Sequence, residues 1–168
     1  MKFPSATVHA RFPSPLGTII TAATSKGLAG LWFDDQRHLP LELTGPMVWP
    51  MDLQHPLLKK VGRQLNDYFA GRQNTFDLPL DLAYGTVFQQ SVWHALLKIP
   101  FGDTISYGEV SARIGRPAAV RAVGSAIGRN PIGIIVPCHR VLAADGALAG
   151  YAGGLERKSA LLALEKKA

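Results

Sequence analysis

Cysteine is almost absent from this sequence of 168 residues, which contains only Cys138. A single thiol cannot close an internal disulfide, and it cannot build a zinc site that needs several thiolates. A disulfide-stapled fold and a cysteine-rich zinc domain are therefore both excluded. Two interpretations of the thiol remain, a buried core residue and a nucleophile.

Long apolar runs are also missing. No run approaches the roughly 20 residues that a membrane helix needs, and Met1–Ser5 lacks the apolar stretch of a signal peptide. We therefore expect no membrane segment. Because the one thiol is free, we expect the protein in a reducing compartment, either the cytoplasm, with the nucleoid in a bacterium, or the nucleus of a eukaryote. Apolar residues make up 47% of the chain and charged residues 18%, a balance that favours a folded core over a disordered chain.

Acidic residues are missing from one stretch of the chain. None lies between Glu109 and Asp145, but five arginines do: Arg113, Arg116, Arg121, Arg129 and Arg140. The net charge of +6 is concentrated accordingly, because residues 85–168 hold 10 Lys and Arg against 5 Asp and Glu. Such a stripe suits phosphate contacts with nucleic acid, and an ordinary solvated basic face has the same pattern.

The first half of the chain shows the alternation of β-strands. Three strands are predicted, over residues 7–12, 18–23 and 28–33. They should pair as an antiparallel meander because turn signals separate them. Apolar residues at helical spacing predict a helix over residues 55–70, and Pro79 limits the alternating segment 76–82 to an edge strand or linker. Residues 34–54 have no pattern that assigns them.

From about residue 85 the pattern becomes helical. Four helices are predicted, over residues 86–97, 106–114, 117–128 and 155–166. The leucines of the last helix, Leu155 among them, are expected to face the core. Thr86 can cap the first of them, and Ser106 with Glu109 forms a capping box at the second. The apolar run 132–136 predicts a short buried strand that carries the cysteine.

These patterns predict an α+β fold, a mixed α/β architecture with two domains. Residues 1–84 form a supporting domain with an antiparallel three-stranded sheet and a helix. Residues 85–168 form a mostly helical domain with a helix-turn-helix and the cysteine strand.

The helix pair 106–114 and 117–128 is a helix-turn-helix candidate, although ordinary helical hairpins are commoner. Its second helix is made mostly of small residues: Ala118, Ala119, Ala122, Gly124, Ser125 and Ala126. Arg121 is the one long charged side chain in its middle. A smooth helix with one arginine suits a narrow groove, where it would read shape and phosphate rather than base edges.

The dipeptide Cys138–His139 is compatible with nucleophilic chemistry and with a core cysteine beside a satisfied histidine. Neighbouring side chains of an extended segment point to opposite faces, so His139 would need a bridging water or a turn at Pro137 to reach the thiol. Asn130 either ties the preceding helix to the cysteine segment or simply ends that helix. The glycine-rich segment 146–154 lacks phosphate-loop spacing and is predicted to be a pocket wall.

Taken together, these motifs resemble the alkylguanine-DNA alkyltransferases, also called methylated-DNA–protein-cysteine methyltransferases. The signature is the segment 137–141, which reads Pro-Cys-His-Arg-Val. Supporting motifs follow in order along nearly the whole chain: Ser14–Gly17, Phe88–Trp93, Ile99–Pro100, Ser106–Tyr107, Arg121–Gly124, Asn130–Pro131 and Gly150–Gly154.

The resemblance implies irreversible transfer of an alkyl group from the O6 oxygen of guanine in DNA, with O4 of thymine as a further target, to Cys138. It implies that His139 acts through a water as base and that Glu165 orients it. Tyr107 would donate a hydrogen bond to N3 of guanine, and Asn130 would brace the cysteine segment. No cofactor is implied, and a structural zinc ion in the first domain is not expected because Cys138 is the sole cysteine.

The resemblance also implies contacts with double-stranded DNA. Arg121 would fill the gap left by the flipped nucleotide, and the DNA-facing set would add Ala122, Gly124, Ser125, Ala126 and Arg129. Carbonyls of Cys138 and Val141 and the amide of Ala152 would read the guanine edge, beside a wall formed by Tyr151. Gly133, where some members carry proline, would loosen the pocket rim. We expect a monomer, with cooperative binding on DNA left open.

Three other functions remain as alternatives. An alkyltransferase-like protein would bind damaged DNA but lack the reactive cysteine that Cys138 provides. A helix-turn-helix regulator would bind a specific sequence and perform no chemistry. A cysteine hydrolase would turn over repeatedly, but the sequence offers no evident oxyanion-hole motif.

Overall fold

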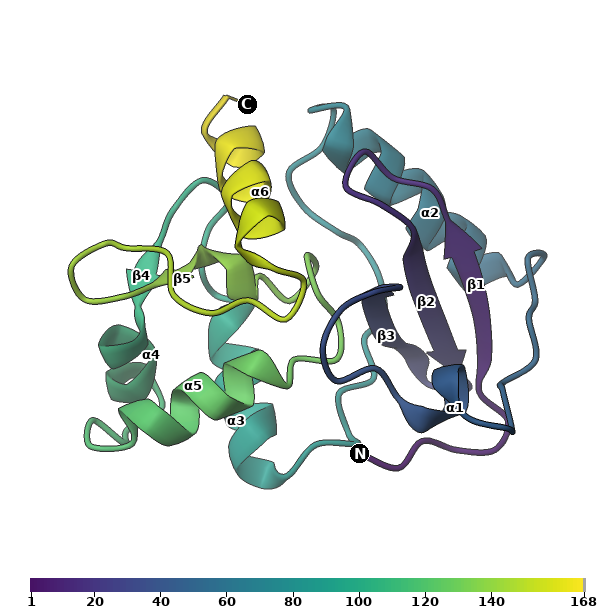
Figure 1. Cartoon of the computed structure of the whole chain (residues 1–168), viewed down its shortest axis with the longest axis horizontal. Helices are drawn as coiled ribbons and strands as arrows, with labels where there is room; N and C mark the ends of the chain where they lie inside the picture. Colours follow the sequence, from purple (N-terminus) through teal and green to yellow (C-terminus); the bar gives the residue numbers. More distant parts are fainter. Residues whose placement is uncertain (168) are drawn as a thin grey trace.

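The computed structural model describes residues 1–167, and its first half is built on a three-stranded antiparallel sheet. The strands are β1 (Val8–Phe12), β2 (Ile19–Thr24) and β3 (Gly27–Phe33), in the order β1-β2-β3 (Figure 1). The predicted meander is therefore confirmed. The ladder between β2 and β3 shifts its register between Ala22 and Ala23.

The two faces of the sheet are buried in different ways. Helix α2 (Pro56–Phe69) packs on one face, where Leu58 and Val61 meet the apolar side of β2. The opposite face is covered by an aromatic cluster of Phe3, Trp32 and Trp49 together with the short helix α1 (Leu41–Thr44). Successive residues of β2 alternate between these two clusters, as the pleat requires. Helix α1 lies in the segment that the sequence pattern left unassigned.

The segment 76–82 runs along the free edge of β3. The amide of Leu28 donates to the Pro79 carbonyl at 2.8 Å, and the amide of Asp81 donates to the Leu28 carbonyl at 2.7 Å. Pro79 has no N–H to contribute, so the pairing is a single bridge rather than a full strand. The prediction of an edge or linker segment is confirmed.

The second half is mostly helical, with helices α3 (Val87–Leu96), α4 (Tyr107–Arg113), α5 (Val120–Gly128) and α6 (Leu155–Lys167). Two short strands, β4 (Ile105–Ser106) and β5 (Val141–Leu142), pair in parallel beside them (Figure 1). Both predicted caps are present, because Thr86 and Ser106 each form a complete capping box. None of the helices within residues 1–167 is long and apolar enough to cross a membrane.

Three predicted details are wrong. The helix expected from residue 117 begins at Val120, because Gly115 has a left-handed φ of 71° and the chain needs residues 117–119 to complete the turn. Residues 133–135 form a turn instead of a strand, and Ile132 makes only an isolated bridge with Leu31. The short strand near the cysteine is β5, which begins at Val141. Leu155 is 46% exposed rather than buried, because it lies on the outer side of the first turn of α6.

The buried face of α6 is unusual because it carries charge. Lys158, Leu161 and Glu165 are spaced at i, i+3 and i+7, which places them on one side of a helix, and all three are buried. This face points into the region where the two halves of the chain meet. The charged side chains there belong to the candidate site.

Candidate active site around Cys138

Cys138 opens a single 3₁₀ turn, η1 (Cys138–Arg140), that follows Pro137. The approach to this turn is held by Asn130, whose amide donates to the Val136 carbonyl at 2.8 Å and whose oxygen accepts from the Ile132 amide at 3.0 Å. The expected tie between α5 and the cysteine segment is thus present. Between these points Ile134 has a φ of 68°, a left-handed conformation that costs a β-branched residue about 1–3 kcal/mol.

The sulfur lies at a small cavity between the two halves of the chain. Cys138 is 7% exposed, and the cavity has a volume of about 150 Å³. Its wall comes from α4, α5, the glycine-rich loop and the N-terminal half: Tyr107, Gly124, Ile127, Gly128, Gly150, Tyr151, Ala152, Arg37 and His38. The thiol is therefore neither sealed in the core nor remote from α5.

Two predicted pocket residues do not line this cavity. Val141 is fully buried in β5, and its carbonyl accepts a hydrogen bond from Lys158. Gly133 is not at the rim either, because its amide donates to the Leu31 carbonyl of β3 at 2.9 Å. The glycine at this position therefore affects the junction with the sheet rather than the pocket mouth.

His139 is paired with Glu165 in the interior. Its Nε2 lies 2.7 Å from Oε1 of Glu165, and both side chains are buried. Arg140 donates from Nε to Oε2 of the same carboxylate at 2.8 Å. Burial alone would raise the pKa of Glu165, but the hydrogen bonds from His139 and Arg140 lower it to about 2. Glu165 is therefore ionised and can only accept hydrogen bonds.

This pairing fixes the protonation of His139. Because the carboxylate only accepts, Nε2 must carry the proton, and Nδ1 is left as the free acceptor. Among the described residues Nδ1 has no hydrogen-bond partner, although it is buried. Burial lowers the pKa of His139 despite the attraction of Glu165, so the ring is neutral near pH 7. A neutral imidazole with a free nitrogen is what a general base requires.

The thiol itself is held in its protonated form. Burial raises the pKa of Cys138, and the Asn130 amide, the charge of Lys158 and nearby backbone amides oppose this effect only in part. Loss of the proton therefore needs a base at the moment of reaction. His139, the next residue in the sequence, has the neutral imidazole that such a base requires.

Lys158 is a functional candidate that sequence patterns did not reveal. Its side chain is fully buried, and Nζ donates to the carbonyls of Val141, Ala149 and Gly150 at 2.6, 3.0 and 3.1 Å. These three bonds use all three ammonium protons and tie β5 to the glycine-rich loop. The signal available in the sequence was its position on the same helix face as Leu161 and Glu165.

Tyr107 connects the same loop to the cavity. Its hydroxyl donates to the Ala149 carbonyl at 2.5 Å, and its ring lies 5.9 Å from Nζ of Lys158. Burial raises the pKa of Tyr107, with a further increase from the nearby Cys138. The phenol therefore stays protonated, and in this structure its one proton is donated to Ala149.

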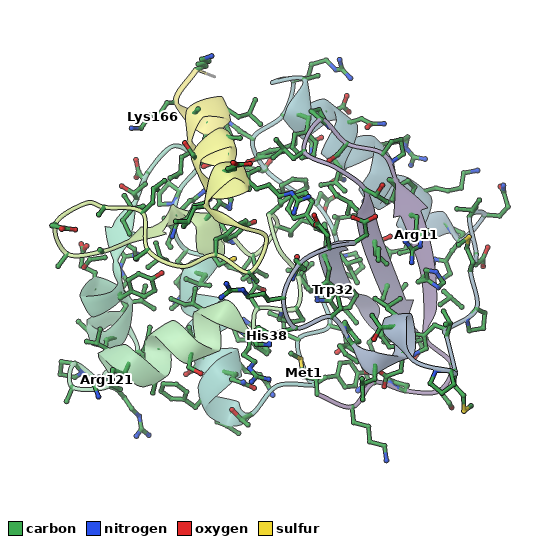
Figure 2. All side chains as sticks on the ribbon, viewed as in Figure 1. Met1, Arg11, Trp32, His38, Arg121 and Lys166 are labelled. Atoms are coloured by element: carbon green, nitrogen blue, oxygen red, sulfur yellow. The ribbon has the colours of Figure 1, made fainter. Side chains whose placement is uncertain are left out.

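Helix α5 presents a smooth outer face that ends at the cavity. Arg121, Gly124, Ser125 and Gly128 follow the spacing i, i+3, i+4 and i+7, so they share this face. Figure 2 places Arg121 at the end of α5 farthest from the sheet, extending away from the body of the molecule. It lies in the first turn of the helix rather than in the middle.

The other residues predicted to face DNA divide into two groups. Ala122, Ser125 and Arg129 are exposed. Ala126 is fully buried, and its carbonyl accepts from the Trp93 indole at 2.9 Å, so its assignment to a DNA-facing surface is wrong. Arg140 likewise leaves the predicted basic stripe, because it is buried against Glu165.

Family models match both halves of the chain. Residues 7–82 match the ribonuclease-like domain of 6-O-methylguanine DNA methyltransferase, and residues 87–167 match its DNA binding domain. This chain belongs to the 6-O-methylguanine DNA methyltransferase family. The family resemblance predicted from the sequence is thereby confirmed, as is the predicted enzyme class, methylated-DNA–protein-cysteine methyltransferase.

Several relatives align along most of this methyltransferase chain. The methylated-DNA–protein-cysteine methyltransferase of Mycobacterium leprae is 48% identical, over 95% of this chain and 93% of that protein. The one from Methanosarcina acetivorans is 46% identical, over 94% and 97%. A crystal structure of Mycobacterium tuberculosis OGT in complex with DNA superposes with a TM-score of 0.85 at 48% identity, covering 95% of this chain and 93% of that one. The predicted α+β fold class is confirmed by this similarity.

Within residues 1–167 of this methyltransferase chain, no three His, Cys, Asp or Glu side chains gather as a metal site would require. The polar side chains that do gather are His139, Arg140 and Glu165, which are joined by hydrogen bonds. The thiol of Cys138 and the phenol of Tyr107 line the cavity, whereas His139 and Glu165 are buried and do not line it.

Proposed function

We propose that this protein repairs DNA by moving an alkyl group from the O6 oxygen of guanine to Sγ of Cys138, once per molecule. The observation that carries the proposal is the position of the sole thiol at a cavity lined in part by α5. The residue that follows the thiol in the sequence is a neutral histidine, paired with Glu165. A relative solved in complex with DNA supports DNA as the partner, and we propose that this DNA is double-stranded. The same chemistry extends the proposal to O4 of alkylated thymine.

The target base must first leave the stack, because its O6 atom is out of reach inside a duplex. Extrusion of a nucleotide costs a few kcal/mol. The small residues on the outer face of α5 would let its backbone approach the minor groove closely, and Arg121 would occupy the space that the base vacates. The flipped guanine would then enter the cavity between Tyr107 and the glycine-rich loop.

The chemical step is a displacement at the alkyl carbon. Nδ1 of His139 accepts the thiol proton through a water, and Sγ of Cys138 forms a bond to the carbon. The bond from that carbon to O6 breaks, and its electron pair stays on the guanine. Tyr107 would turn its hydroxyl from the Ala149 carbonyl to N3 and stabilise the negative charge there. The guanine anion then takes up a proton from solvent, and the imidazolium returns its own proton to solvent.

The product is a thioether, and no described group near it is placed to release the alkyl chain. We therefore propose a stoichiometric reaction, one alkyl group for each protein molecule. This property separates the proposal from a cysteine hydrolase, which would turn over repeatedly. A sequence-specific regulator would instead bind DNA without becoming labelled.

The flipping role of Arg121 can be tested with two substrates. Arg121→Ala should slow transfer from methylguanine in duplex DNA by on the order of tenfold or more, since extrusion costs a few kcal/mol and each 1.4 kcal/mol or so is tenfold. Its reaction with a free-base analogue should stay near the parent rate, because no flipping is needed. Arg63→Ala, an exposed arginine on α2, is the matched control. Equal losses on both substrates would remove Arg121 from the flipping step.

A further inference from the structure

One side chain of the N-terminal half reaches the catalytic pair, His139 and Glu165. Tyr68 lies in the last turn of α2 and is 1% exposed. Its hydroxyl donates to Oε1 of Glu165 at 2.8 Å, and this is the same oxygen that pairs with Nε2 of His139. The two residues are 97 positions apart in sequence, and α2 and α6 belong to opposite halves of the fold (Figure 1).

The hydroxyl of Tyr68 is held in place from several sides. Its ring packs against Phe69 and Phe76 with centroids 5.4 Å apart in each case, and against Phe101 at 6.2 Å. Burial next to the Glu165 carboxylate raises the pKa of Tyr68 far above its ordinary value, so the phenol remains a donor. The hydroxyl of Tyr68 therefore donates to Glu165 at every pH at which the protein is folded and the phenol keeps its proton.

We propose that Tyr68 is a positioning residue for alkyl transfer, which sets the basicity of His139 by competing with it for Oε1 of Glu165. This inference rests on the proposed function, because it assigns His139 the role of base. It makes the N-terminal half a participant in the chemistry, where the sequence indicated only support.

The negative charge of Glu165 is shared among several hydrogen-bond donors. Its two oxygens accept from Tyr68, His139 and Arg140 and from the Gly102 amide. A carboxylate bound by that many donors stabilises a neighbouring imidazolium less than a carboxylate bound by His139 alone. His139 therefore stays neutral near pH 7, with Nδ1 free to take the thiol proton. Without the phenol donor, more of the charge acts on His139, and the imidazolium becomes more favourable.

The same other titratable and charged groups surround the pair in the parent and in a Tyr68 variant. They come from η1, α6 and the glycine-rich loop: Cys138, Arg140, Lys158 and Tyr151. A shift in the titration of His139 can therefore be assigned to the lost hydroxyl.

The test compares Tyr68→Phe with Tyr84→Phe. Tyr84 also donates to a carboxylate, Oδ2 of Asp81 at 2.9 Å, but Asp81 does not touch the catalytic pair. Single-turnover methyl transfer from duplex DNA is measured across pH. Loss of this hydrogen bond to a charged group leaves more of the carboxylate charge acting on His139. The acidic limb of the rate profile of Tyr68→Phe should therefore move up by about one pH unit. Its rate should be about tenfold lower below the limb and should converge with the parent at alkaline pH. The profile of Tyr84→Phe should match the parent.

A second variant tests the opposite direction without removing the hydroxyl. Tyr68→3-fluorotyrosine keeps the size of the side chain and makes the phenol a stronger donor, so the acidic limb should move to lower pH. This variant keeps the test decisive if Tyr68→Phe does not fold. Loss of rate by one factor at every pH would indicate a merely structural role and would overturn the proposal.

The outcomes also separate this inference from the proposed function. If the parent accepts no methyl group at any pH, the proposed function fails. If the parent reacts but neither Tyr68 variant moves the acidic limb, the function stands and the role of Tyr68 is rejected.

Discussion

At Cys138 the protein combines a buried thiol with the means to ionise it. Burial raises the pKa of the thiol, which keeps it protonated before its single reaction, and in the proposed function His139 provides the base when substrate arrives. The loop that covers the cavity depends in turn on a buried cation, Lys158, with three carbonyl partners. Single side chains therefore control both the chemistry and the shape of the site.

Replacing Lys158 tests this dependence. Lys158→Met keeps the apolar stem but removes the Lys158 donor from the Val141 and Gly150 carbonyls, whereas the Ala149 carbonyl keeps Tyr107. A buried group left unpaired costs about 1–3 kcal/mol. We expect the free energy of unfolding to fall by about 3 kcal/mol or more, as measured by urea denaturation. Lys166→Met, an exposed change on the same helix, should have little effect. A loss for Lys158→Met as small as that of the control would contradict the assigned role.

At the scale of elements, the sequence predicted those features that depend on residues close together in the chain, such as helix caps. Thr86 and Ser106 marked helix starts because their side chains cap the nearest backbone amides. The run 132–136 misled because its apolar composition fits a strand, whereas Ile134 is held in a left-handed turn by the Asn130 contacts around it. Tyr68 and Lys158 could not be assigned from patterns, because their partners lie on other elements of the fold.

The cap of α4 can be removed without touching the cavity. Ser106→Ala deletes the acceptor for the Glu109 amide at 3.1 Å, and loss of such a cap costs about 1 kcal/mol of stability. Equilibrium unfolding in urea should show this loss. Ser159→Ala, an exposed serine within α6, is the control that should leave stability nearly unchanged. If the two variants are equally stable, the capping box does not stabilise the helix.

At the scale of the whole molecule, the two halves are joined by contacts that also build the site. The amide of Leu31 in β3 donates to the Pro131 carbonyl at 2.8 Å, and Arg157 of α6 pairs with Asp35 at 2.7 Å. The Tyr68–Glu165 bond adds a buried link between them. The predicted division at residues 84 and 85 stays a prediction.

Acid should destabilise the whole molecule through the buried pair. The folded-state pKa of His139 lies below its ordinary 6.5, and that of Glu165, about 2, lies below its ordinary 4.5. The unfolded chain therefore binds more protons than the folded chain, so the free energy of unfolding falls as pH drops below 6.5 and falls further below 4.5. Buried His9, whose pKa is also lowered, adds to the first window.

Urea unfolding at a series of pH values measures this dependence. Glu165→Gln should lose the part below 4.5, because an amide does not titrate, and should be less stable than the parent at pH 7. Stability that stays flat from neutral to acidic pH would contradict the pKa shifts and the buried pairing behind them.

The most direct test of the whole account is the mass of the peptide that contains Cys138 after the protein has met duplex DNA carrying O6-methylguanine. The account predicts that one methyl group replaces the thiol hydrogen on this peptide, at one equivalent per protein molecule, and that Cys138→Ser binds the same DNA without any gain in mass. A parent protein that stays unmodified, or a methyl group found on another residue, would contradict it.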